Sequence, residues 1–195
     1  DFFHAYGDTL GAELLIEQGK LDALVGAPLN VNSTVAVPAY LFDTLRLPIR
    51  KRTDSGAGST NDKILEAMRL DPRVPAHARA AIGQIQEVRE IRKIKSSFAD
   101  AIPQFVRDGR IHPRFRIVST GRLAASDPNL LAFPKHSKRG LRIREGFVAA
   151  PGQLLGSADI SQIEMRVFAI DCGDERMLAK FRTGHDFHTM GAAEK

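Results

Sequence analysis

The sequence has little cysteine, no long apolar run and no repeated or low-complexity segment. Its one cysteine, Cys172, excludes an internal disulfide framework and fits a reducing compartment. No apolar run reaches the length that a membrane-spanning helix needs. The first residues, DFFHAYGDTL, lack both a starting Met and the basic-then-apolar layout of a signal peptide. We therefore expect a soluble protein with no membrane segment, and a chain that is a piece of a longer one.

The chain has enough apolar residues for a packed core, and it carries an excess of positive charge. Its 195 residues, 43% of them hydrophobic, suit one large domain or two small ones. The formal net charge is +5, and basic residues gather in VREIRKIK (88–95), RDGRIHPRFR (107–116) and KHSKRGLRIR (135–144). One such run is ordinarily a solvated face. Three of them together favour a nucleic-acid partner.

The first half of the sequence has the apolar spacing of helices. We expect helices at residues 9–25, 36–46, 61–70 and 75–98. Gly26 and Pro28 end the first of these helices, and Ser59 or Thr60 is expected to cap the third. The apolar stripe of the fourth helix changes direction along its length, which predicts a bend or break near Gly83.

From Arg110 onward the pattern changes to short extended pieces. RIHPRFRIVS (110–119) and GFVAAPGQLLGSAD (146–159) contain β-branched and aromatic residues interrupted by Pro and Gly. Helical spacing returns in SQIEMRVFAIDCG (161–173), and a last helix is expected to begin near Asp186. The predicted fold class is therefore α+β, with a mainly helical part followed by antiparallel strands.

The stretch SADISQIEMRVF (157–168) holds two acids that suggest either a helix start or a metal site. Asp159 lies at the end of an extended run and just before a helix, where the helix dipole favours a carboxylate. Ser161 and Glu164 fit the S-x-x-E capping box. Spacing alone favours this structural interpretation. A strand end is also a common place for a carboxylate that ligates Mg²⁺, which prefers oxygen ligands.

The stretch GHDFHT (184–189) has several interpretations. His185 and His188 are spaced i, i+3, so on a helix they are able to share a face and ligate a metal. His185 and Asp186 also match the HD pair of metal-dependent phosphohydrolases, but no companion set of ligands stands out upstream.

An ordered set of motifs resembles the family A, polymerase I-like DNA polymerases. STGRLAASDPNL (119–130) and ADISQIEMR (158–166) are similar to the family's T-G-R-L segment, which ends in P-N-L, and to its motif A, D-Y-S-Q-I-E-L-R. The other members occur in the family's order: LNVNS (29–33), the loop 56–60, VREIRKIKSSF (88–98), GRIHPRF (109–115), LRIREGFVA (141–149) and GHDFHT. Any one of them is a weak indication, but the ordered set is specific. It covers the chain from about residue 28 to its end.

The resemblance implies an active site with two Mg²⁺ ions around motif A. Asp159 is expected to ligate both ions, and Ile160 to offer its backbone carbonyl to one of them. The second metal-binding carboxylate is expected outside this chain. Glu164 is expected near the sugar of the incoming nucleotide, where its shape excludes a ribonucleotide. Contacts with the incoming dNTP are expected from motif A and one histidine: Ser161, Gln162, Ile163, Glu164 and His188.

The resemblance also implies contacts with primer–template DNA. Arg122 is expected to test pairing geometry at the minor-groove edge of the primer terminus, and Asn129 to make a second contact. Taken alone, Arg122 fits a surface salt bridge and Asn129 a turn residue. The remaining expected contacts reach backbone phosphates and read no sequence: Asn30, Asn32, Ser33, Ser59, Thr60, Arg89, Lys93 and Lys95.

The same resemblance predicts how the chain is divided. Residues 1–108 are expected to form a thumb-like helical region, 109–170 the first part of the palm with motif A, and 171–195 the start of the fingers-side helices. The fingers motif and motif C are absent from the sequence, so we expect no polymerase activity from this chain alone. Ile160 replaces the usual Tyr, and Leu131–Ala132 replace Gln-Asn, departures that resemble phage-type members.

The resemblance therefore implies a DNA-directed DNA polymerase that is monomeric and cytoplasmic, in a bacterial cell or a phage-infected host. Two alternatives stay open. One is a non-catalytic relative that only binds DNA. The other is an HD-type metal phosphohydrolase that uses His185 and Asp186.

Overall fold

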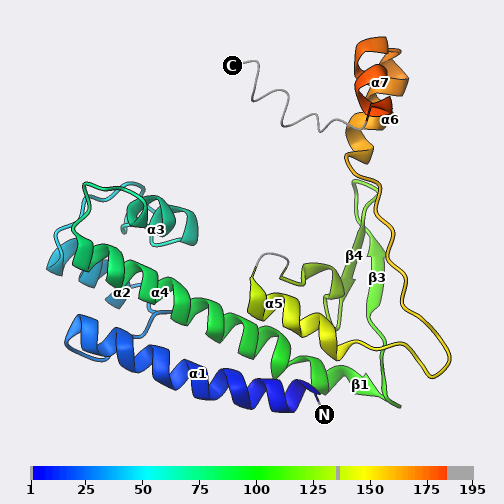
Figure 1. The fold of residues 1–195 in the computed structure, drawn as a ribbon. Helices are drawn as coiled ribbons and strands as arrows, with labels where there is room; N and C mark the ends of the chain where they lie inside the picture. The colour runs from blue at the N-terminus through cyan, green and yellow to red at the C-terminus, as the bar shows by residue number, and fades with distance from the viewer. Residues whose placement is uncertain (1, 135–136, 184–195) are drawn as a thin grey trace. The chain divides into compact units, whose positions relative to one another are not determined.

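The computed structural model describes residues 2–134 and 137–183, and Figure 1 shows their arrangement as a ribbon. The chain divides into two compact units, Asp1–Phe147 and Val148–Lys195. None of the helices in the described ranges combines the length and the apolar character that a membrane span requires.

Two long helices, α1 (Phe2–Val25) and α4 (Ala76–Ile94), lie side by side in the first unit (Figure 1). Helix α1 begins well before the predicted start at residue 9, because Tyr6 and Leu10 are buried against α4 and the segment after it. Gly26, with a positive φ of 80°, follows its last residue, as the sequence indicates.

Helix α4 is continuous, which excludes the break predicted near Gly83 as an alternative to a bend. The stripe changes direction because the two halves of one helix pack into two different apolar clusters. Ile82 and Ile85 belong to a cluster that includes Leu21 and Leu65, whereas Ile94 belongs to one that includes Leu10. The irregular part comes later, where α4 continues as the π-helical turn η2 (Lys95–Ala99).

The segment between the long helices forms three short elements: α2 (Ala36–Pro38), the π-helical η1 (Ala39–Thr44) and α3 (Asp62–Arg69). The predicted cap of α3 is wrong. Asn61 caps it, since its Oδ1 accepts a hydrogen bond of 2.9 Å from the Ile64 amide. Ser59 lies two residues before the cap and is buried in the loop, where its amide donates to the Lys51 carbonyl at 2.8 Å.

Short turns and two antiparallel hairpins follow α4, which confirms the α+β class. After the 3₁₀ turn η3 (Ile102–Phe105), β1 (Val106–Arg107) pairs with β2 (Arg110–Ile111). Next, β3 (Arg114–Ile117) pairs with β4 (Leu123–Ser126), with Phe115 opposite Ala125. The unit ends with η4 (Leu130–Ala132), α5 (Lys138–Arg142) and η5 (Ile143–Gly146).

Arg139 joins α5 to both long helices through its side chain and its backbone. The guanidinium contacts Glu13 of α1 at 2.5 Å, and Glu87 and Glu90 of α4 at 2.5 and 3.3 Å. These carboxylates hold the pKa of Arg139 above its usual range, the hydrogen bonds with Glu13 having the largest effect. The Arg139 carbonyl accepts a hydrogen bond of 2.9 Å from the Tyr6 hydroxyl.

The second unit contains α6 (Ile163–Cys172) and α7 (Glu175–Arg182), packed through Ala169, Met177 and Phe181. The helix predicted within 161–173 is confirmed. The extended run predicted before Asp159 forms no strand, because no described segment pairs with residues 148–160. The sequence analysis also missed α7, whose cap Asp174 accepts hydrogen bonds from the Arg176 and Met177 amides. The helix predicted from Asp186 lies outside the described residues.

We predict that Arg139→Met lowers the free energy of unfolding by about 1–3 kcal/mol, because three partly buried carboxylates lose their counter-charge. Urea denaturation followed by circular dichroism measures the change. Arg144→Met is the matched control. Arg144 is exposed and is not part of this network, so this substitution removes the same charge without breaking the ion pairs of Arg139. Equal stability of the two variants would contradict a structural role for Arg139.

Candidate nucleic-acid interface and motif A segment

A polar depression of about 440 Å³ lies where the loop after α1 meets α3 and α4. It brings together three of the residues predicted to contact DNA, Asn32, Arg89 and Lys93. The other side chains around it are Asn61, Asp62, Arg92 and Ser96. The depression therefore brings asparagine side chains from two loops together with basic side chains of α4, although these segments are far apart in the sequence.

Arg89 uses its guanidinium inside the protein. It donates to the Val31 carbonyl at 2.8 Å, to the Thr60 carbonyl at 2.6 Å and to the Thr60 hydroxyl at 3.3 Å. Burial lowers the pKa of this group from its ordinary value. Arg89 therefore fixes two loops to α4, and its predicted contact with a phosphate stays a prediction.

The residues of LNVNS form a local turn that leads into α2. The Asn30 side chain accepts a hydrogen bond of 3.1 Å from the Asn32 amide. The Ser33 hydroxyl accepts from the Val35 and Ala36 amides at 3.3 and 2.9 Å, which occupies it at the start of α2. Asn32 is the member of this turn whose side chain reaches the depression.

Of the other predicted phosphate contacts of the first unit, Ser59, Thr60 and Lys95 are buried or have partners within the protein, and Lys93 differs from them. Ser59 is 7% exposed, and the Thr60 hydroxyl accepts from Arg89. Lys95 pairs with Asp100, with Nζ 2.8 Å from one carboxylate oxygen. The Lys93 side chain forms no hydrogen bond or ion pair with the residues that the structure describes, and Lys93 lines the depression.

The residues of the T-G-R-L and P-N-L segment lie at the two ends of β4. Arg122 is exposed in the turn before β4, where its carbonyl accepts from the Val118 amide at 2.9 Å. Asn129 follows β4, and its Oδ1 accepts from the Leu131 amide at 3.1 Å as the cap of η4. The interpretation of Asn129 as a turn residue is thus correct. Its predicted contact with DNA stays a prediction.

The motif A residues lie in the second unit, on an exposed segment that leads into α6. Asp159 and Glu164 are exposed, and Ile160 is 63% exposed. The predicted capping box does not form as expected. Its N-cap would be Ser161, but the helix begins after Gln162, whose φ of 55° is left-handed and whose side chain makes no cap hydrogen bond. The backbone turns sharply between Asp159 and Glu164 for this reason.

Arg166 supports the same segment from the next turn of α6. Its Nε donates to the Ser161 carbonyl at 2.9 Å, and its guanidinium lies 4.7 Å from the centre of the Phe181 ring on α7. The sequence analysis did not single out Arg166, although it is the last residue of the quoted motif.

Within residues 2–134 and 137–183, no three His, Cys, Asp or Glu side chains gather closely enough to hold a metal ion. His188, predicted to contact the nucleotide, lies outside the described residues. So do His185 and Asp186, on which the phosphohydrolase alternative depends. The sequence analysis also missed Arg92 and Asn61 as lining residues of the depression. Arg92 was recognisable from its place on the polar side of α4 with Arg89 and Lys93.

Comparison with known proteins agrees with this arrangement. The model of DNA polymerase family A matches residues 1–195. The chain therefore belongs to DNA polymerase family A. It is 40% identical to the thermostable DNA polymerase I of Thermus aquaticus over 97% of this chain and 23% of that protein. It is 37% identical to DNA polymerase I of Lactococcus lactis over 87% of this chain and 19% of that protein.

A solved structure shows the same fold. The polymerase domain of Pol1 from M. smegmatis, in complex with DNA primer-template and dNTP, matches 96% of this chain with a TM-score of 0.81 and 27% identity. This chain covers 32% of that structure and about a fifth to a quarter of the two relatives. The recognised family is confirmed; the resemblance of Ile160 and Leu131–Ala132 to phage-type members stays a prediction.

We predict that Arg89→Lys lowers the free energy of unfolding by about 1–3 kcal/mol, because an ammonium cannot replace the three guanidinium hydrogen bonds. Hydrogen exchange should quicken at the amides around Val31 and Thr60. Lys93→Gln is the control, because it removes a positive charge from the same helix but leaves the hydrogen bonds of Arg89 intact. Unchanged stability and exchange in Arg89→Lys would show that the guanidinium does not hold the loops.

Proposed function

We propose that this chain is part of a template-directed DNA polymerase, which joins a dNTP to the 3′-hydroxyl of a primer. The observation that carries the proposal is the match to DNA polymerase family A over residues 1–195. The ordered motifs from LNVNS to GHDFHT support it, and so does the similarity to a domain solved with DNA primer-template and dNTP. The proposed partners are therefore primer–template DNA and a dNTP.

Motif A is proposed to supply part of a Mg²⁺ site. The Asp159 carboxylate and the Ile160 carbonyl are both oxygen donors, which suits a hard cation that binds few carboxylates. Asp159 is exposed, so its carboxylate is accessible to an ion. When bound, two Mg²⁺ ions would activate the primer hydroxyl and stabilise the leaving pyrophosphate. A second carboxylate from outside this chain is required to complete the site.

The turn from Asp159 to Glu164 is proposed to receive the incoming nucleotide. The left-handed Gln162 places Glu164 in the first turn of α6, close in sequence to the metal-binding residue. There a fixed side chain would exclude a 2′-hydroxyl by shape. Ser161, Gln162 and Ile163 are proposed to line the same turn, and His188 to contact the phosphates.

The depression around Asn32 and Lys93 is proposed to follow the DNA backbone. Lys93 offers an ammonium with no intramolecular partner among the described residues, and Asn32 offers an amide from the facing loop. Such contacts add affinity that falls with salt and carries no sequence information. Arg122, exposed before β4, is proposed to test the primer terminus, and Asn129 to contact the DNA.

The remaining expectations concern the protein as a whole. We propose that the polymerase is a cytoplasmic monomer, and that residues 1–108, 109–170 and 171–195 belong to thumb, palm and fingers. The boundary between the two compact units, after Phe147, lies within the proposed palm region. Motif A therefore belongs to the second unit, and the hairpin that contains Arg122 belongs to the first. Because the second carboxylate and the fingers motif are missing from the sequence, this chain by itself is proposed to be inactive.

We predict that Asp159→Asn abolishes primer extension in a polymerase that carries this chain together with the missing motifs. The amide cannot neutralise the metal ions, whereas the DNA-contacting side chains are unaffected. Gel-resolved extension and fluorescence anisotropy with the same primer–template measure the two effects. Asp171→Asn, an exposed acid on the same unit, should leave extension unchanged. Full activity of Asp159→Asn would refute the assignment.

We predict that Lys93→Gln weakens duplex binding by this chain for every sequence tested, because one phosphate contact is lost. The slope of log affinity against log salt should fall in magnitude by about 1. Anisotropy titrations of two unrelated duplexes at several salt concentrations provide the measurement. Lys51→Gln is the control, since Lys51 is exposed and lies outside the depression. An unchanged slope would place the interface elsewhere.

A further inference from the structure

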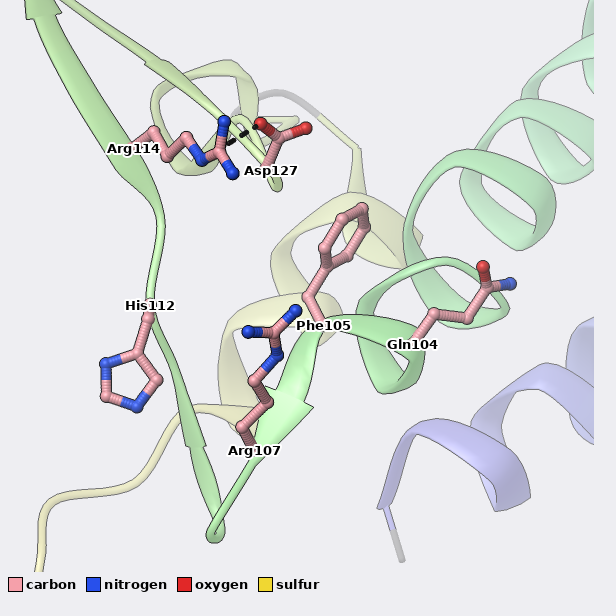
Figure 2. Close-up of a pocket in the computed structure, with 6 residues that line it drawn as sticks. All are labelled: Gln104, Phe105, Arg107, His112, Arg114 and Asp127. Carbon is pink, nitrogen blue, oxygen red and sulfur yellow. Dashed lines mark ion pairs between the residues drawn. The ribbon is translucent and has the colours of Figure 1, made fainter.

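A second hollow, of about 390 Å³, lies beside the two hairpins of the first unit, and Figure 2 shows it in close-up. Three segments contribute to it: the end of η3, the β1–β2 hairpin with the residue after it, and the β3–β4 hairpin. Its lining residues are Gln104, Phe105, Arg107, His112, Arg114 and Asp127. None of them belongs to the DNA-contacting or nucleotide-contacting residues proposed above.

The lining combines an aromatic ring with cationic groups. Phe105 is half-buried, and Figure 2 shows its ring between the Arg114–Asp127 pair and the Arg107 side chain. Within the described residues, Arg107 and His112 form no hydrogen bond or ion pair with another side chain. The hollow therefore presents one guanidinium and one imidazole whose hydrogen-bonding groups are open to a ligand.

The second guanidinium of the hollow is held only weakly. Arg114 lies 3.8 Å from Asp127, and their side chains are 83% and 58% exposed. An exposed pair at this distance contributes about 0–1 kcal/mol, so an arriving anion displaces the carboxylate at little cost. Arg110 and Arg116, exposed on the same hairpins, add to the positive potential around the hollow.

These groups match the chemistry of a nucleotide better than that of a metal ion or an acidic peptide. One carboxylate among two arginines is a poor cation site. An acidic peptide uses the guanidiniums but leaves the aromatic ring without a flat partner. A nucleotide satisfies both, because its base stacks on an aromatic face and its phosphate pairs with arginine.

We infer that this hollow binds one unpaired nucleotide of a nucleic-acid strand, with the base against Phe105 and the flanking phosphates held by Arg107 and Arg114. The hollow's volume suits one small ligand group. The inference rests on the proposed function for the class of ligand, and adds to it a place where the bound strand is single-stranded.

The test compares two labelled probes on residues 1–195: a ten-nucleotide dT strand, and an abasic strand with the same number of phosphates. Fluorescence anisotropy gives the affinity for each. The wild-type chain should prefer the dT strand by at least about fivefold, because only that strand stacks. The preference should disappear in Phe105→Leu and persist in Phe105→Tyr, which keeps the flat ring.

Two charge variants move affinity in opposite directions. Arg107→Gln should weaken both probes several-fold and reduce the salt slope by about 0.7, because one phosphate contact is lost. Asp127→Asn should tighten both probes, since Arg114 is then released to the strand. Arg116→Gln removes the same charge as Arg107→Gln without lining the hollow, so the preference for bases should survive in it.

Equal wild-type affinity for the two probes would overturn the inference, as would an unchanged preference in Phe105→Leu or no gain in Asp127→Asn. Duplex DNA measured on the same samples separates this result from the proposed function. Retained duplex binding with no base preference would dismiss only the hollow. Loss of duplex binding by the wild-type chain would dismiss the proposed function itself.

Discussion

The burial of α4 in two apolar clusters is the constraint on which the first unit depends. Ala78, Ile82 and Ile85 are buried in one cluster, and Ile91 and Ile94 are buried in the other. Because the C-terminal half of α4 is fixed by its second cluster, the basic run VREIRKIK places Arg89, Arg92 and Lys93 on the polar side of that half. The direction of these cations is therefore a consequence of core packing, and the loop amides of Asn32 and Asn61 meet them because the same core anchors the loops.

Positive charge has two uses in this chain, and the sequence does not separate them. Arg89 and Arg139 each sit among several acceptors, and their guanidiniums hold loops and helices together. A planar group with five donors suits such a place better than lysine does. Lys93, Arg107 and the exposed arginines of the hairpins remain for a polyanion. The net charge of +5 thus overstates the charge that is available to a nucleic acid at any one site.

Motif A illustrates how a motif and a site differ. The segment from Asp159 to Glu164 is exposed, and the left-handed Gln162 gives it a sharp turn into α6. Arg166 braces that turn from α6 and stacks on Phe181 of α7. These contacts set the local shape of the segment within its own unit. Catalysis by two metals needs further carboxylate ligands, and these come from outside the described residues in the proposed function.

The sequence by itself determined the family, the helical first half, the extended character of residues 110–119 and the helix of motif A. Periodicity and ordered motifs are local properties, so they need no knowledge of neighbours. Tertiary structure decided the unbroken course of α4 through Gly83, the absence of a strand before Asp159 and the capping of α3 by Asn61. It also decided that Arg89 holds loops, that Lys95 pairs with Asp100 and that Phe105 meets Arg107 and Arg114. Each of these depends on which distant segment supplies the partner, and spacing along the chain carries no such information.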